Sequence, residues 1–238
     1  IEDIKRLYHN ESLGNKSSSY RQWVQAFPET TDFWSTQLTD VALPKLSKQS
    51  HYTEVTLNAK STQHLLTVAN NAYHTQINDL LLTALGFALR DWLGGSEYTI
   101  TLEGHGREDI HERLDVSRTV GWFTSMYPVK LKPQEDIGDS IQWTKENLRK
   151  IPNKGLGFRL MELLPSISFN YLGQFDQQSG YWQVISESSG ISVPPENEKP
   201  QVLNMNGLVV EGQLQFTLST HISSQACKDI ASLFEQHL

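Results

Sequence analysis

The chain has one cysteine, Cys227, among 238 residues, which excludes an internal disulfide and a metal site built from several of its own thiolates. Positive charge is also scarce. The net charge of −7 argues against a nucleic-acid-binding surface. The longest apolar run, residues 80–89, is interrupted by Thr83 and Gly86 and is too short to cross a bilayer. The first residues show no signal-peptide pattern, so we expect a soluble, cytoplasmic protein without a membrane or nucleic-acid partner.

The composition is that of a folded globular protein. Hydrophobic residues make up 38% of the chain and aromatic residues 10%, enough for a sizeable core in 238 residues. Helical and strand-like patterns alternate without an internal repeat, which predicts a mixed α/β sandwich. Helices are predicted over 1–8, 20–27, from 32, 61–73, 77–93, from 139 or 140 to 151, and after 223 or 224. Strands are predicted over 52–57, 98–103, 124–131, 167–172, 181–185, 203–210 and 214–220.

Side-chain types suggest where some of these helices begin and how they pack. Ser61 is expected to cap its helix, and either Ser223 or Ser224 the final one. Residues 77–93 are apolar on nearly all sides, which predicts a central helix. Cys227 falls among apolar residues of the final helix, so we expect it to serve packing.

In residues 98–103 apolar and polar side chains alternate as in a strand, and charged residues follow at once in 103–108. Glu103 follows the last apolar residue of the pattern, and Gly104 and Gly106 flank His105, so the backbone can turn sharply there. A carboxylate at the end of a buried strand is a candidate proton-transfer group. A turn with a solvated acidic cluster is the alternative, and the segment alone favours that alternative.

Familiar cofactor motifs are absent from the sequence. Gly104-His105-Gly106 follows a strand but lacks the third glycine of a dinucleotide-binding turn. His105 and His111 are six residues apart, a spacing that suits neither a helix face nor a turn, so no metal site is predicted. No Gly-x-Ser-x-Gly nucleophile elbow occurs.

Three longer motifs occur in a fixed order: EGHGRE at 103–108, RTVGWFTSMYP at 118–128 and FNYLGQF at 169–175. Together they resemble the signature motifs of epimerization domains of nonribosomal peptide synthetases, which are members of the condensation-domain superfamily. Residues 78–82 and 145–152 resemble that family too, so the likeness covers essentially the whole chain. Condensation domains carry Gly-Arg-Pro in place of the Gly-His-Gly-Arg-Glu run, which makes peptide-bond formation the alternative. A non-catalytic lobe that docks a carrier protein is a third hypothesis.

The resemblance implies a chloramphenicol-acetyltransferase-like two-layer α/β sandwich, one lobe of a V-shaped domain with two lobes. Residues 1–50 would then be the end of the N-terminal lobe and the linker, and residues 51–238 the C-terminal lobe. The family's His-His-x-x-x-Asp-Gly motif lies in the N-terminal lobe and is expected before residue 1, so this chain alone should be inactive. The connections 27–33, 41–52 and 160–166 are short for the family.

The activity implied by the resemblance is epimerization, from L to D, at the Cα of an aminoacyl or peptidyl thioester carried on phosphopantetheine. Such a reaction needs a base and an acid on opposite faces of Cα, and hydrogen-bond donors for the enolate. The resemblance implies that Glu103 is one proton-transfer group, and that the histidine of the missing motif is the other or partners the enolate. Burial would raise the pKa of Glu103 toward the working pH.

Further site residues follow from the same motifs. Tyr127, Asn170 and Tyr171 match positions near the family's channel and would position substrate or donate hydrogen bonds, although packing explains each of them equally well. His105 and Arg107 are expected to shape the turn, and Arg118 to anchor a loop through an ion pair.

Two aromatic residues of the second motif, Trp122 and Phe123, are expected in the core. No metal or redox cofactor is implied. Phosphopantetheine would be supplied by the partner, a peptidyl carrier protein bearing the thioester, and other synthetase modules are the remaining expected partners.

Overall fold

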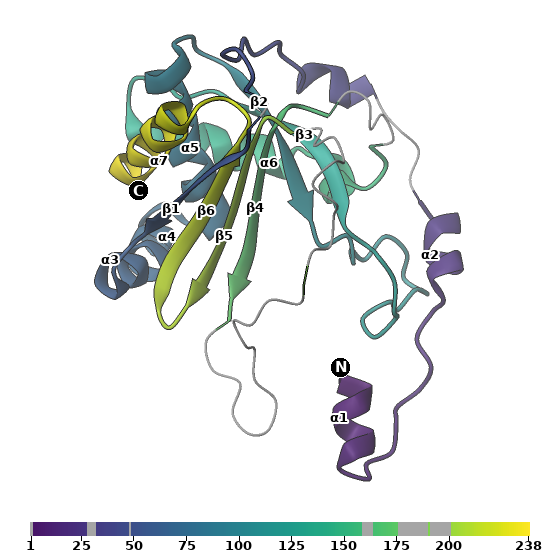
Figure 1. The fold of residues 1–238 in the computed structure, drawn as a ribbon. Coiled ribbons are helices and arrows are strands. Elements are labelled where there is room, and N and C mark those ends of the chain that lie inside the picture. The colour runs from purple at the N-terminus through teal and green to yellow at the C-terminus, as the bar shows by residue number, and fades with distance from the viewer. Residues whose placement is uncertain (1, 28–31, 48, 159–163, 176–189, 191–200) are drawn as a thin grey trace.

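The computed structural model describes residues 2–27, 32–47, 49–158, 164–175, 190 and 201–238. These residues form a six-stranded sheet with helices packed against it (Figure 1). The strands are β1 (His51–Thr56), β2 (Tyr98–Gly104), β3 (Ser125–Leu131), β4 (Ile167–Gln174), β5 (Leu203–Val210) and β6 (Gln213–Thr220). The helices are α1 (Glu2–Tyr8), α2 (Tyr20–Gln25), α3 (Ala59–His64), α4 (Asn70–Tyr73), α5 (Ile77–Leu93), α6 (Ile137–Arg149) and α7 (Ser224–His237). Short helical turns cover Asp32–Thr36, Leu65–Ala69 and Pro152–Gly155.

The strand order β1-β6-β5-β4-β2-β3 places three parallel strands, β5, β4 and β2, beside one another. The other neighbours pair antiparallel. In the β2–β4 pair, Leu102 lies opposite Phe169, so Glu103 and Asn170 come next on their strands. The last residues of β2 therefore lie beside the middle of β4, which continues beyond them to Gln174.

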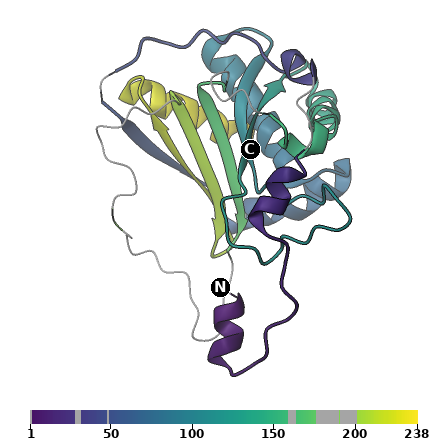
Figure 2. The same cartoon turned by 90° about the vertical axis from the view of Figure 1, so that its right-hand side faces the viewer.

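The core lies between the sheet and the helices α5 and α7, which pack against each other (Figure 2). In β5 and β6, buried residues alternate with more exposed ones, as expected for strands covered on one face. The Phe216 ring joins the two layers, with centroids 5.4 Å from Phe169 in the sheet and 5.1 Å from Phe234 in α7. The predicted α/β class is confirmed.

Several local predictions are confirmed. Helix α5 and strand β5 cover the predicted residues, and β6 begins one residue earlier than predicted, at Gln213. Ser223 accepts a hydrogen bond from the Ala226 N–H and caps α7. Cys227 is buried in that helix, as expected of a packing residue.

Two predicted helix starts are wrong. Asn58, rather than Ser61, caps α3, and its side chain accepts a hydrogen bond from the Ser61 N–H. Asp136 caps α6, three or four residues before the expected start at 139 or 140. In each case an earlier Asn or Asp is an equally good cap, and composition alone does not choose between them. The strand predicted over 181–185 lies outside the described residues.

The loop of residues 105–124 joins β2 to β3, and Arg107, which belongs to this loop, forms hydrogen bonds across it. Arg107 donates hydrogen bonds to the carbonyl oxygens of Val116 and Thr119, the latter at 2.9 Å. Its guanidinium also lies 3.9 Å above the centroid of the Phe123 ring. These contacts tie both halves of the loop together.

The N-terminal segment 2–27 lies along this loop, with α1 away from the sheet (Figures 1 and 2). Arg118 forms an ion pair with Asp3 at 2.8 Å and donates to the Asn15 carbonyl at 3.0 Å. A small second apolar cluster, Trp23, Val116, Phe123 and Leu156, joins the segment, the loop and the turn after α6. In the described part of the chain, no helix is long and apolar enough to cross a membrane.

Gly106 should be required for the course of the loop. Gly106 and Gly94 both have positive φ, +67° and +72°, which costs other residues about 1–3 kcal/mol. A Cβ at Gly106 would lie 1.6 Å from the Phe123 carbonyl oxygen, whereas a Cβ at Gly94 would meet nothing within 4 Å. We expect Gly106→Ala to lower the free energy of unfolding clearly more than Gly94→Ala in denaturant titrations. Equal losses would show that the loop backbone yields to the added methyl group.

Candidate active site

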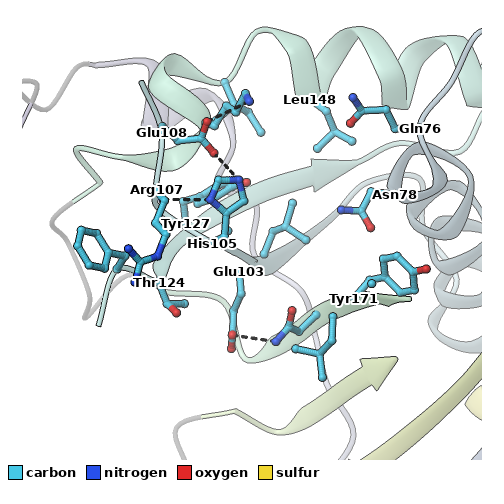
Figure 3. Close-up of a pocket in the computed structure, with 18 of the residues that line it drawn as sticks. Gln76, Asn78, Glu103, His105, Arg107, Glu108, Thr124, Tyr127, Leu148 and Tyr171 are labelled. Carbon is cyan, nitrogen blue, oxygen red and sulfur yellow. Dashed lines mark hydrogen bonds and ion pairs between the residues drawn. The ribbon is translucent and has the colours of Figure 1, made fainter. Parts of the chain in front are cut away.

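A cleft of about 870 Å³ opens where β2 and β4 end (Figure 3). Its walls come from these two strands, from β3, from the first turn of α5, from the end of α6 and from the 105–124 loop. The lining residues used below are Asn78, Leu102, Glu103, His105, Arg107, Glu108, Trp122, Tyr127, Lys154, Asn170 and Tyr171. All three longer sequence motifs therefore converge here from distant parts of the chain.

Glu103 is the central acidic group of the cleft. The β2–β4 register places it beside Asn170, whose Nδ2 donates a hydrogen bond to Glu103 Oε2 at 3.0 Å (Figure 3). The side chain is partly buried, and burial raises its pKa above the ordinary value of glutamic acid. A carboxylate that is oriented by an amide and poorly solvated is a stronger base than one in water.

Tyr127, on β3, is almost fully buried below the cleft, at 6% exposure. Burial raises its pKa, and the negative charge of Glu108 raises it further, so the phenol stays protonated at neutral pH. Gly155 leaves room for the ring, because a Cβ there would lie 1.8 Å from Tyr127 Cδ1. Tyr127 can therefore act as a neutral hydrogen-bond donor.

Tyr171 and Asn78 line the cleft on the side away from Arg107 (Figure 3). Tyr171 precedes a register shift between β4 and β5, and such irregularities redirect side chains at the end of a strand. Asn78 lies in the first turn of α5, with its Oδ1 buried and without a hydrogen bond. The sequence suggested Asn78 only as part of the 78–82 motif, because no local pattern reveals an unpaired oxygen.

A second acidic group, Glu108, lies at the cleft between His105 and Lys154. Its carboxylate is 3.1 Å from His105 Nε2 and 3.0 Å from Lys154 Nζ, and its side chain is 14% exposed (Figure 3). His105 Nδ1 also accepts a hydrogen bond from the Arg107 N–H, two residues further along the turn. This cluster cannot be recognised in the sequence, because Lys154 reaches Glu108 only in the folded chain. Among the described residues, no three His, Cys, Asp or Glu side chains group as a metal site.

The expectation for Trp122 is wrong, although that for Phe123 is confirmed. Phe123 is buried at 3% exposure, whereas Trp122 is 80% exposed and borders the cleft. Adjacent residues in an extended segment point to opposite sides, so only one of the two can face the small apolar cluster. Arg107 and Arg118 act as anchors of the loop, through the contacts described above.

Comparison with known proteins gives the family. The model of the Condensation domain matches residues 1–238. The chain is 35% identical to Surfactin synthase subunit 1 of Bacillus subtilis (strain 168) and 36% identical to Gramicidin S synthase 1 of Brevibacillus brevis. All of this chain is covered in both comparisons, but only 8% and 27% of the two relatives. The first alignment runs over 284 positions, so that relative has additional residues within the matched region.

Solved structures agree with this result. The epimerization domain from the third module of tyrocidine synthetase B superposes with a TM-score of 0.84 at 33% identity, covering 98% of this chain and 61% of that one. The cyclization-docking bidomain of EpoB from Sorangium cellulosum has a TM-score of 0.65 at 14% identity, over 97% of this chain and 54% of that one, and shows the fold alone. The predicted chloramphenicol-acetyltransferase-like sandwich is thereby confirmed. The chain belongs to the condensation-domain family.

Proposed function

We propose that this chain carries part of the active site of an epimerase that inverts the Cα of an aminoacyl or peptidyl thioester held on phosphopantetheine. The observation that carries the proposal is Glu103, a poorly solvated carboxylate that Asn170 orients in the cleft. The likeness to an epimerization domain at 33% identity supports it as well. The substrate would be delivered by a peptidyl carrier protein within a synthetase.

In the proposed reaction, the Glu103 carboxylate removes the proton from Cα. The electron pair of the C–H bond moves into the thioester carbonyl and forms an enolate, which the neutral Tyr127 phenol can stabilise by donating a hydrogen bond. A second group on the opposite face returns a proton to Cα and leaves the inverted centre. The resemblance assigns that group to the N-terminal lobe, and the division of lobes at residue 50 stays a prediction.

The other polar residues of the cleft have supporting roles in this proposal. Asn170 orients the Glu103 carboxylate through its hydrogen bond. Tyr171 is the next residue of β4 and also lines the cleft, where it can position the substrate. Peptide-bond formation, the general activity suggested by the family name, would not need a base placed against Cα. Exchange of the Cα proton with solvent therefore distinguishes epimerization both from condensation and from mere carrier docking.

Replacement of the base should abolish that exchange. We expect Glu103→Gln, in the complete synthetase loaded with a carrier-bound aminoacyl thioester, to lower the rate of Cα deuterium uptake from D₂O by roughly 10²–10⁴-fold. Glutamine keeps an oxygen that accepts from Asn170, so the cleft geometry is retained while the base is lost. Mass spectrometry and chiral analysis of the released product measure both exchange and inversion.

The matched control is Glu54→Gln, since Glu54 is an exposed carboxylate on the edge strand β1 and far from the cleft in the sheet order. It should exchange at the wild-type rate. Undiminished exchange in Glu103→Gln would remove Glu103 from the mechanism. Peptide-bond formation without any exchange in the wild-type protein would establish condensation instead.

The raised pKa of Glu103 also predicts a pH dependence of stability. Because the folded state holds the Glu103 proton more tightly than the unfolded state, folding is favoured at low pH and this advantage is lost as pH rises through the folded-state pKa. Glu103→Gln removes the burial penalty of the charged form. We therefore expect the melting temperature of the variant, relative to wild type, to rise from acidic to neutral pH. A relative fall over the same range would show that the charged carboxylate is stabilised by the fold.

A further inference from the structure

The turn after α6 has a backbone conformation that residues with a side chain rarely adopt. Asn153 and Lys154 have φ angles of +47° and +49°, and Gly155 follows at +90°. Asparagine tolerates this left-handed region because its short polar side chain can form local hydrogen bonds, but lysine has no such compensation. The turn of residues 153–155 is therefore strained, and Lys154 is its least favourable position.

Buried residues on both sides keep this turn in its conformation. Ile151 precedes the turn and Leu156 follows it, at 6% and 3% exposure. The Leu156 N–H donates a hydrogen bond to the Asn153 carbonyl oxygen at 3.1 Å, and the Leu156 side chain belongs to the small apolar cluster. Strained backbone persists where its surroundings impose it in this way, and such segments gather at functional sites.

The turn contacts the surroundings of both groups that the proposed reaction uses. Gly155 lies against the Tyr127 ring, where a Cβ would fall 1.8 Å from Cδ1. The Lys154 carbonyl oxygen would lie 3.6 Å from a Cβ at Gly104, the residue that follows Glu103. Both contacts are made by the backbone of the turn. They are therefore independent of where the exposed Lys154 ammonium points.

We propose that the turn of residues 153–155 is a positioning element, which holds the Tyr127 ring and the end of β2 in the geometry that proton transfer requires. This inference rests on the proposed function, because the role that it assigns belongs to that reaction. Lys154 is the position where stability is lost for this purpose. Glycine would adopt the same φ freely, but it would also let the turn move.

The ion pair of Lys154 with Glu108 is a separate matter. The Lys154 side chain is 74% exposed, and ion pairs of such exposed groups contribute little to stability. A test of the backbone must nevertheless keep the loss of the ammonium constant.

The test compares Lys154→Gly with Lys154→Ala in the complete synthetase. Both variants lose the ammonium, so they differ only in the freedom of the backbone. We expect the glycine variant to melt about 1–3 °C higher than the alanine variant, because glycine relieves the strain at positive φ. With saturating carrier-bound substrate, its Cα deuterium exchange should nevertheless be roughly three- to tenfold slower, with KM unchanged.

Glu211 provides a matched control. It has a φ of +51° in the turn between β5 and β6, it is exposed, and it is not among the described residues that line the cleft. Glu211→Gly should also melt higher than Glu211→Ala, but the two variants should exchange the Cα proton at the same rate. This second comparison separates the relief of strain from the loss of position.

A further measurement needs no reaction. Amide hydrogen exchange, followed by mass spectrometry of the peptides that contain Gly104 and Tyr127, should be faster in Lys154→Gly than in Lys154→Ala. A variant that melts higher but exchanges these amides faster has gained overall stability and lost local order beside the cleft.

Four results would overturn the inference. Equal melting temperatures of Lys154→Gly and Lys154→Ala would show that the backbone is not strained there. Equal rates of Cα exchange, or equal rates of amide exchange, would show that the turn does not position its neighbours. Slower Cα exchange in Glu211→Gly than in Glu211→Ala would indicate a general effect of glycine. Absence of Cα exchange in the wild type is a different outcome, because it contradicts the proposed function itself.

Discussion

The parallel pairing of β2 with β4 is the constraint on which the candidate site depends. Leu102 lies opposite Phe169 in this pairing. The next residues on the two strands, Glu103 and Asn170, form a hydrogen bond in the cleft. A shift of one residue would turn one of these side chains to the other face of the sheet. The core that fixes this register, including the Phe169–Phe216–Phe234 ring contacts, therefore acts directly on the geometry of the site.

The second constraint is the loop of residues 105–124, which closes one side of the cleft. Its course depends on two arginines that donate to backbone carbonyls, Arg107 within the loop and Arg118 toward the N-terminal segment. Hydrogen bonds from a charged donor are stronger than neutral ones, which suits a loop with only a small apolar cluster beneath it. The motif residues around Glu103 thus divide into the proposed base and the residues that hold the loop around it.

The burial of Glu103 has opposite effects on the stability of its charged form and on its strength as a base. Burial raises the pKa of Glu103 and disfavours the charged form that a base requires, whereas Glu108 lies 3.1 Å from His105 Nε2 and forms an ion pair with Lys154. Burial thus suits Glu103 to take up a proton, and the ion pair with Lys154 suits Glu108 to hold the turn in place. The environment of each carboxylate, rather than its type, separates their roles.

Local patterns are enough to predict the elements with strong periodicity, such as α5 and the β5–β6 hairpin, and the position of Glu103 at the end of a strand. By contrast, the exposure of Trp122, the burial of Phe123 and the contact of Lys154 with Glu108 depend on how distant segments pack together. Alternation shows that neighbours point to opposite sides but not which side is covered. That choice depends on α2 and on the turn after α6, which reach the loop from distant parts of the chain.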